Sequence, residues 1–248
     1  MPGSGVVKSP CFASGILKIL MSDITRNRFI LPLSGYGLDI GPLHRPMVKH
    51  KGMQVRYVDR FPVEKLREHY PELAKFDLIE PDFLDDAETL STFPDNTEDF
   101  VIASHVIEHM RNPIGAVENW LRVLKTGKHL YLVVPDYRKI FDKHRKRTTL
   151  QHMIEDYTDP SPFRDRDHYW EYAEKVNCEF FGRPLDVEEE TIRLFYTDYS
   201  IHFHTFTPDS MFALLQYVSG YLQPIEIVDS VAHDDEEEFH FLVEKLGA

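Results

Sequence analysis

The chain alternates short apolar runs with amphipathic segments, and this alternation restricts the folds open to it. Residues 36–41, 53–60, 99–105 and 129–136 are apolar runs of strand length. Segments with helical periodicity follow the second and third of these runs. Apolar strands that alternate with helices are typical of a parallel sheet covered by helices on both faces. The sequence therefore predicts an α/β fold.

Two of the predicted helices carry residues that favour a helix end. Residues 62–70 begin with Pro62, a residue that suits the first helical turn because that turn needs no backbone N–H there. Residues 114–127 form an amphipathic segment, and we expect Gly127 to end that helix.

The C-terminal part predicts one more helix and a hairpin. Residues 207–218 are helical in pattern, with Thr207 as N-cap and Pro208 at the first helical position. Residues 225–233 and 237–246 read as two strands joined by an acidic turn. We expect this hairpin to close the sheet.

The middle of the chain differs from both flanks. Residues 137–200 are rich in charged and aromatic side chains and contain no convincing buried strand, so they predict a mostly helical insertion or lid. We expect a single domain made of a lead-in (1–34, with a short helix near 16–21), a first half (35–136), this insertion, and a C-terminal part (201–248).

Composition excludes several classes of protein. The net charge of −13 disfavours nucleic-acid binding, which needs clustered positive charge. The two cysteines, Cys11 and Cys178, lie far apart and favour a reducing cytoplasm over a disulfide framework. The apolar residues 15–21 are too few to span a bilayer, and no signal-peptide pattern is clear. We expect a cytoplasmic protein without membrane contact.

Residues 104–109 read SHVIEH, and His-x-x-Glu-His is a zinc-protease pattern. In that interpretation His105 and His109 bind zinc from one helix, with Glu108 as the base. The preceding FVIAS favours a strand instead, and no third ligand is evident. Alternatively, the histidines lie at a strand-to-helix corner, where they satisfy hydrogen bonds or adjoin a cofactor. We therefore expect no metal site.

The block from Asp86 to Asp136 resembles the class I S-adenosylmethionine-dependent methyltransferases, especially their type 11 branch. Members of that branch carry Asp-Ala-Glu, Phe-Pro-Asp, a strand entering Ser-x-x-x-Glu-His, and an amphipathic helix before the next strand. The corresponding letters here are DAE, FPD, SHVIEH and AVENWLRVLKTGK. The resemblance covers residues 35–136 well, with a weaker echo in the last forty residues. It favours the cofactor interpretation of SHVIEH.

This resemblance implies a Rossmann-like, mostly parallel seven-stranded sheet with helices on both faces and a closing C-terminal hairpin. Residues 35–136 would be its cofactor-binding half, and S-adenosyl-L-methionine its cofactor. The implied activity is methyl transfer to a small-molecule or glycan-linked acceptor. The first alternative is a protein of the same fold and bound cofactor with another role, either a regulator or an enzyme that uses the sulfonium without methyl transfer. A metal hydrolase built on His105 and His109 is the more remote alternative.

Strand ends supply candidate cofactor residues, because ligands of open parallel sheets bind beyond the carboxyl ends of the strands. Asp39 and Gly41 end the first strand and would form a turn beneath the methionine part of the cofactor. Asp59 ends the second strand, about twenty residues later, where a carboxylate can accept both ribose hydroxyls. Asp39 could instead cap a turn, and Asp59 could pair with Arg60 or Arg56 at the surface.

The resemblance assigns the remaining cofactor contacts. It implies that the Asp86 side chain meets the exocyclic amine of adenine and that the Ala87 backbone meets the ring. Ser104 and His105 would lie near the sulfonium and its methyl group. A purely structural alternative also holds for Asp86, since it stands in an acidic run of the kind that usually forms a solvated face.

The first turn departs from the family pattern. The family has Glu/Asp-x-Gly-x-Gly-x-Gly, whereas Leu43 and Arg45 replace the later glycines here and Pro42 intervenes. A side chain at position 43 is expected to hold the backbone further from the cofactor. KTGK replaces Lys-Pro-Gly-Gly, and Glu98 stands where the family usually has an aromatic residue.

Three histidines are candidate general bases. His105 follows the third strand, while His202 and His204 are two residues apart and would share one face of an extended segment. We expect the insertion to roof the cofactor cleft and His202 or His204 to point into it. A solvated strand face is the alternative for this pair.

One basic run interrupts the acidic chain. Residues 138–149 contain six Lys or Arg residues directly after a strand end. They predict an anionic acceptor, such as one bearing a carboxylate or phosphate. A solvated helix whose charges offset the acidic remainder is the alternative.

Overall fold

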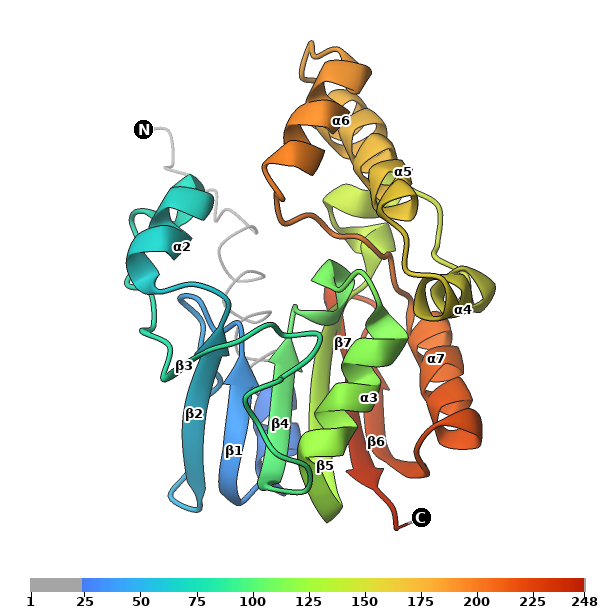
Figure 1. Ribbon diagram of the computed structural model, residues 1–248. Helices are drawn as coiled ribbons and strands as arrows, with labels where there is room; N and C mark the ends of the chain where they lie inside the picture. Colours follow the sequence, from blue (N-terminus) through green and yellow to red (C-terminus); the bar gives the residue numbers. More distant parts are fainter. Residues whose placement is uncertain (1–23, 248) are drawn as a thin grey trace, which may run out of the picture.

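The computed structural model describes residues 24–247 and contains one seven-stranded sheet in the order β3-β2-β1-β4-β5-β7-β6 (Figure 1). Strands β1 to β5 are parallel where they pair, and β7 lies antiparallel between β5 and β6. The strands are β1 (Gly35–Ile40), β2 (Met53–Asp59), β3 (Phe83–Leu84), β4 (Glu98–Ser104), β5 (Leu124–Pro135), β6 (Ile225–Ala232) and β7 (Glu238–Lys245). The predicted α/β fold and closing hairpin are confirmed.

Helices fill the connections. The α-helices are α2 (Val63–His69), α3 (Pro113–Val123), α4 (Leu150–Thr158), α5 (Pro162–Tyr172), α6 (Val187–Tyr196) and α7 (Pro208–Tyr221). Short 3-10 turns are η1 (Pro71–Leu73), η2 (Ile107–His109), η3 (Tyr137–Lys139) and η4 (Phe141–His144), and η5 (Ala173–Phe180) is π-helical. Helix α7 begins as predicted. The Thr207 side chain accepts from the Ser210 backbone N–H, and the Ser210 side chain accepts from the Thr207 backbone N–H, which together form a capping box.

Both faces of the sheet are buried, as the apolar strands predict. On β4, Val101 and Ala103 face the core under α3 and α7, while Phe100 and Ile102 face the opposite side. This alternation follows from the two-residue period of a strand. The opposite face is covered by the helical residues 24–30.

Residues 24–34 are thus part of the domain, although we expected only a lead-in there. Phe29 is fully buried, and its ring stacks on Tyr131 of β5 at 5.4 Å between ring centroids. Ile30 and Leu33 are also buried in the same cluster. The short helix predicted near residues 16–21 lies outside the described residues.

The prediction that Gly127 ends the third helix is wrong. Helix α3 ends at Val123, and Leu124 already takes extended backbone angles and pairs with Glu98 of β4. The loop before β4 satisfies the last helical carbonyls: the Thr97 N–H donates to Val123 at 2.9 Å. Gly127 instead lies within β5 at a positive φ of 73°. Tertiary pairing therefore ends this helix earlier than its own sequence predicts.

The expected insertion is mostly helical: irregular segments, including residues 145–149 and 181–186, join the helices from η3 to α6. Helices α5 and α6 stand above the carboxyl ends of the parallel strands (Figure 1). They have a small core of their own, which includes Tyr169, Leu194 and Phe203. The helices within residues 24–247 include none long and apolar enough to cross a bilayer.

Close packing of β1 on β4 yields a stability prediction. A Cβ added at Gly37 would lie 2.3 Å from the backbone oxygen of Phe100, its partner on β4. Because that oxygen is held in the centre of the sheet, Gly37→Ala should lower the free energy of unfolding by about 2–3 kcal/mol. Gly220→Ala in α7 is the matched control: its Cβ meets nothing within 4 Å, and a gain of up to about 1 kcal/mol is expected. Equal urea midpoints for the two variants would contradict this account.

Candidate active site

A pocket of about 850 Å³, including its open mouth, lies at the carboxyl ends of β1, β2, β3 and β4. It spans the position between β1 and β4 where the strand order reverses, the usual ligand site of such sheets. Its lining includes Gly41 and Leu43 after β1, Asp59 and Arg60 after β2, Asp86 and Ala87 after β3, and His105 and His109 after β4.

Asp59 ends β2 and lines the pocket, as the sequence predicts for a ribose ligand. Its Oδ1 accepts from the Arg60 backbone N–H at 2.8 Å. Burial raises the pKa of Asp59 to about 6, against the lowering effect of the Arg60 and Phe61 backbone N–H groups. At neutral pH the group is a carboxylate that can accept two hydroxyl hydrogen bonds.

Asp86 and Ala87 line the pocket beside Asp59. The Asp86 Oδ1 accepts from the Glu88 backbone N–H at 2.8 Å and so shapes the turn. The Ala87 carbonyl accepts from Trp120 Nε1 at 2.8 Å. The fully buried Trp120 of α3 thereby fixes this loop against the domain core.

The turn after β1 explains how the chain tolerates the missing glycines. Gly41 and Leu43 both line the pocket with positive φ values, 60° and 46°. Leu43 therefore takes the left-handed conformation that a glycine of the family pattern would adopt more easily. Asp39 does not line the pocket: it is buried, and its Oδ2 accepts from the Met47 N–H at 2.9 Å. Burial raises its pKa to about 7.

His105 faces the pocket from the residue after β4, with a strained φ of 56°. Its Nε2 lies 2.8 Å from Oε2 of Glu238, and its Nδ1 lies 3.6 Å from Oε1 of Glu108. Burial lowers the pKa of His105, but the hydrogen bond to Glu238 and the nearby carboxylates outweigh it, so the pKa is raised. Ser104, its neighbour, does not line the pocket.

The comparisons with known proteins identify the family of this domain. A family model described as a methyltransferase domain matches residues 13–181, more than half of the chain. The chain belongs to this family. It is a class I S-adenosylmethionine-dependent methyltransferase in domain and fold, with S-adenosylmethionine as its cofactor. No curated protein matches it.

Solved structures show a similar fold at low sequence identity. A Rhodobacter sphaeroides structure named for zinc-dependent alcohol dehydrogenases has a TM-score of 0.52 at 13% identity and covers 91% of this chain and 90% of its own. A Thermotoga maritima S-adenosylmethionine-dependent methyltransferase has a TM-score of 0.46 at 13% identity, with coverage of 91% and 88%. One from Aquifex aeolicus has 0.48 at 14%, with coverage of 90% and 89%.

The SHVIEH segment of this methyltransferase domain is not the helix that a zinc protease needs. Ser104 is the last residue of β4, and only Ile107–His109 form a helical turn, the short 3-10 turn η2. His105 bonds to Glu238, whereas Nδ1 of His109 lies 2.9 Å from the Ile201 carbonyl. The two imidazoles therefore have separate partners. Burial and the nearby His202 lower the pKa of His109 to about 3, so its ring is neutral.

The prediction that His202 or His204 points into the pocket is wrong, because neither lines it. His202 Nδ1 lies 2.5 Å from Oδ2 of Asp142, and His204 is fully buried with its Nε2 3.1 Å from the Arg111 carbonyl. Arg145 holds this segment from behind by donating to the carbonyls of residues 202 and 203. Both imidazoles therefore bond to other parts of the protein and do not face the pocket.

The end of the insertion does reach the pocket. Asp198 accepts from Arg60 at 2.6 Å and from Arg111 at 2.5 Å, and both arginines line the pocket. Ser200 lines it as well, and its N–H lies 3.3 Å from Nε2 of His69. Residues 198–200 thus lie beside the pocket and cover part of it. The other residues of the insertion do not line the pocket.

The basic run has mostly internal partners. Arg138 pairs with Asp136 at 2.6 Å, and Lys139 donates to the His233 and Glu236 carbonyls. Arg145 is buried among backbone and carboxylate acceptors. None of the three lines the pocket. These contacts favour the structural interpretation of these cations over recognition of an anionic acceptor.

The acidic residue Glu98, which stands where the family usually has an aromatic residue, also has a structural explanation. Its buried side chain forms an ion pair with Arg56 of β2. The Arg56 guanidinium in turn lies over the rings of Phe83 and Phe93, with centroids 5.7 and 5.8 Å away. Sequence analysis missed this pair, as it missed the partners Glu238 and Asp198. Each depends on residues far apart in the chain, for which the sequence carries no local signal.

Proposed function

We propose that this protein transfers the methyl group of S-adenosylmethionine to a small-molecule or glycan-linked acceptor, with His105 as the general base. The observation that carries the proposal is the convergence of Asp59, Asp86 and His105 on one pocket at the carboxyl edge of a methyltransferase sheet. Each comes from the end of a different strand, so the pocket can hold an extended nucleoside with its reactive end at His105.

The cofactor orientation follows from the donors and acceptors along the pocket. Asp59 would accept the two ribose hydroxyls. Asp86 would accept the exocyclic amine of adenine through its Oδ2, because Oδ1 already binds the turn. Since the Ala87 carbonyl is bound to Trp120, its N–H is the group left to meet the adenine ring. Gly41 would lie beneath the methionine part.

His105 and Glu238 form a pair suited to proton removal. Glu238 accepts the Nε2–H of His105, so the Nδ1 lone pair is left to take the acceptor proton. The resulting imidazolium would be stabilised by Glu238 and Glu108, which agrees with the raised pKa of His105. His109 lines the same pocket but is a weaker base, because its pKa is lowered to about 3.

Methyl transfer itself requires little more than alignment. Bound S-adenosylmethionine would supply a methyl group on a positively charged sulfur, which an aligned nucleophile of the acceptor could take in line, with S-adenosylhomocysteine as the leaving group. Residues 198–200 would limit the water that reaches the aligned atoms, since they lie at the mouth through Asp198 and Ser200.

Incubation with donor labelled in the methyl group tests this proposal. Purified protein, labelled S-adenosylmethionine and small-molecule and glycan fractions of a cell extract should yield a labelled product that requires the protein. Heat-treated protein is the control. Tight binding of S-adenosylhomocysteine without any labelled product in any fraction would favour a regulatory role instead.

A further inference from the structure

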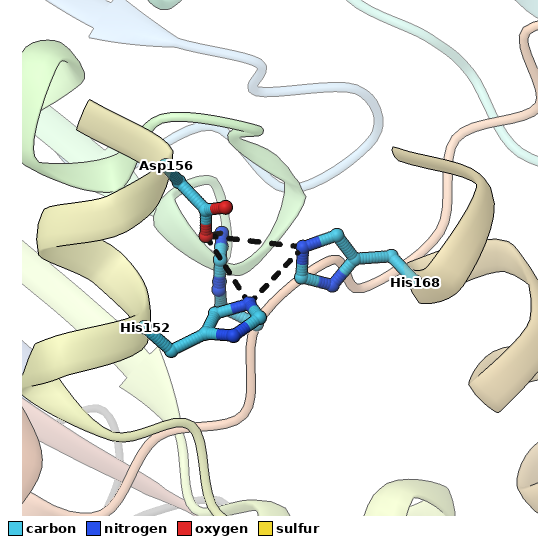
Figure 2. Close-up of side chains that lie close together, drawn as sticks. His152, Asp156 and His168 are labelled. Atoms are coloured by element: carbon cyan, nitrogen blue, oxygen red, sulfur yellow. Dashed lines mark hydrogen bonds and ion pairs between the residues drawn. The ribbon is translucent and has the colours of Figure 1, made fainter. Parts of the chain in front are cut away.

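A cluster of three imidazoles and one carboxylate lies between the insertion and the segment before α7, and none of its members lines the pocket. His152 and Asp156 lie one turn apart on α4, His168 belongs to α5, and His204 lies in the segment before α7 (Figure 2). One ligand atom from each lies within 4.8 Å of the others. Four potential metal ligands thus converge from three segments.

The distances agree with a single ion at the centre. Asp156 Oδ2 lies 3.2 Å from Nε2 of His152, 3.8 Å from that of His168 and 3.7 Å from that of His204. The Nε2 atoms of His152 and His168 are 3.3 Å apart. Zinc–nitrogen and zinc–oxygen bonds of about 2.0–2.2 Å place tetrahedral ligands roughly 3.3–3.5 Å apart. The cluster needs little rearrangement to reach that geometry.

One buried polar atom of the cluster, Oδ2 of Asp156, lacks a hydrogen-bond partner within the described chain, and Asp156 is only 4% exposed. An unsatisfied buried polar atom is costly, and such atoms mark sites for water or an ion. Asp156 Oδ2 is the atom that faces the three imidazoles.

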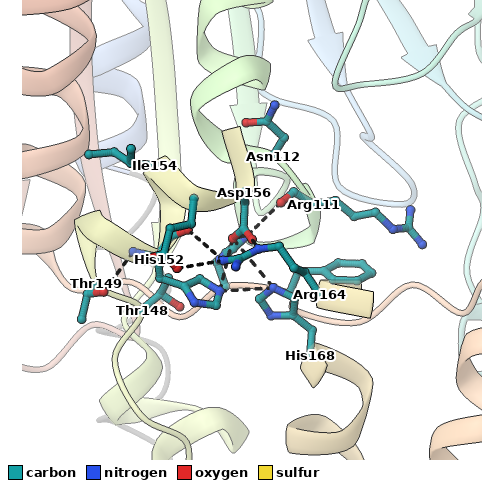
Figure 3. Close-up of polar contacts among 12 residues, drawn as sticks. Arg111, Asn112, Thr148, Thr149, His152, Ile154, Asp156, Arg164 and His168 are labelled. Atoms are coloured by element: carbon teal, nitrogen blue, oxygen red, sulfur yellow. Dashed lines mark hydrogen bonds and ion pairs between the residues drawn. The ribbon is translucent and has the colours of Figure 1, made fainter. Parts of the chain in front are cut away.

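The surroundings shield the cluster from water and hold its carboxylate in place. His168 and His204 are only 7% and 0% exposed. Arg164 pairs with the other oxygen of Asp156, which leaves Oδ2 to face the cluster (Figure 3).

We propose that His152, Asp156, His168 and His204 bind one divalent transition-metal ion, with zinc the best match for three nitrogens and one oxygen. All four positions are filled by the protein, so the site is structural. Binding would require the other tautomer of His204: the Nε2 proton would be lost as Nδ1 gains one, the contact with the Arg111 carbonyl would be released, and the Nε2 lone pair would then be free for the ion. This inference is independent of methyl transfer and replaces our expectation that the chain has no metal site.

The ion would join the insertion to the pocket wall. It links α4 and α5 to the segment before α7, and that segment also bonds to η2, since the His204 N–H donates to the Glu108 carbonyl at 3.1 Å. A second group, Glu108, His109 and His202, has ligand atoms within 4.8 Å of one another. That group offers only three ligands, and both of its imidazoles already have partners: His109 bonds to the Ile201 carbonyl and His202 to the Asp142 carboxylate. The four-residue cluster is therefore the better site.

Zinc titration of untagged protein after chelator treatment tests the proposal. Wild type should bind one zinc equivalent and gain thermal stability, and cobalt in its place should give the intense visible absorption of a tetrahedral ion. His152→Gln should weaken zinc binding by about 100-fold or more. His144→Gln is the matched control, because both side chains are 40% exposed and His144 lies outside the cluster. His109→Gln should also keep the zinc.

The outcomes separate the possibilities. Retained S-adenosylhomocysteine binding by His152→Gln would show that the variant is folded. Asp156→Asn is a second variant that removes one of the four proposed ligands. The proposal is overturned if wild type binds no zinc, if its cobalt complex lacks the tetrahedral absorption, or if His152→Gln and His144→Gln bind zinc equally. Loss of zinc in His109→Gln alone would assign the ion to the other group.

Discussion

Replacing His105 with alanine is expected to lower kcat by about 10²–10⁴-fold, the usual contribution of a general base. The proposed base takes the acceptor proton at Nδ1 while Glu238 holds Nε2 at 2.8 Å. S-adenosylhomocysteine affinity should change less than threefold, because adenine and ribose are bound by other residues. Steady-state rates on the labelled acceptor and calorimetry with S-adenosylhomocysteine measure the two effects separately.

His129→Ala is a matched control for that variant. His129 of β5 also faces a glutamate on β7, with Nε2 3.6 Å from Glu244, but Glu244 lies at the opposite end of β7 from Glu238. Its kcat should be unchanged. If His105→Ala were as active as His129→Ala, His105 would not be the base. His109 would then be the remaining imidazole among the pocket-lining residues.

Asp59→Asn is expected to weaken S-adenosylhomocysteine binding by about 1–3 kcal/mol, the cost of losing charge-assisted hydrogen bonds to the ribose. The wild type should also lose affinity as the pH falls through about 6, because Asp59 then becomes protonated and loses acceptor capacity. Burial raises the pKa of Asp59 in the free protein to about 6. Above that pH Asp59 is a carboxylate and binds the ligand, and below it Asp59 is protonated and ligand affinity falls.

Calorimetry across pH 5 to 8 measures both parts of this prediction. Asp59→Asn should lack the loss of affinity near pH 6 that the wild type shows. Asp234→Asn, an exposed carboxylate in the turn between β6 and β7, should behave as wild type. An Asp59→Asn variant that binds as tightly as wild type at pH 8 would exclude Asp59 as the ribose ligand.

The fold could be predicted where burial leaves a local pattern. The apolar runs of β1, β4 and β5 have consecutive buried residues, so they differ clearly from their flanks. β2 is only partly buried, but it still has the apolar pattern of a strand. β3 was missed because it has only two residues and both are exposed. The helix over residues 24–30 was missed because its burial depends on the far face of the sheet, which includes Tyr131.

The site residues could be predicted only where the end of a single strand was enough to place the residue in the pocket. Asp59, Asp86 and His105 follow their own strands, so the parallel sheet alone brings them to one edge. His202 and His204 could not be placed in this way, because Arg145 and Asp142 decide where their segment lies. The metal cluster was invisible for the same reason: apart from the pair on α4, its members meet only through the packing of α5 and the segment before α7.

A crystal structure of the complex with S-adenosylhomocysteine tests the central claim most directly. We predict both ribose hydroxyls within hydrogen-bond distance of the Asp59 carboxylate, adenine against Asp86 and Ala87, and the sulfur directed toward His105. A ligand bound elsewhere on the protein, or one in this pocket whose sulfur points away from His105 with its ribose far from Asp59, would contradict the account.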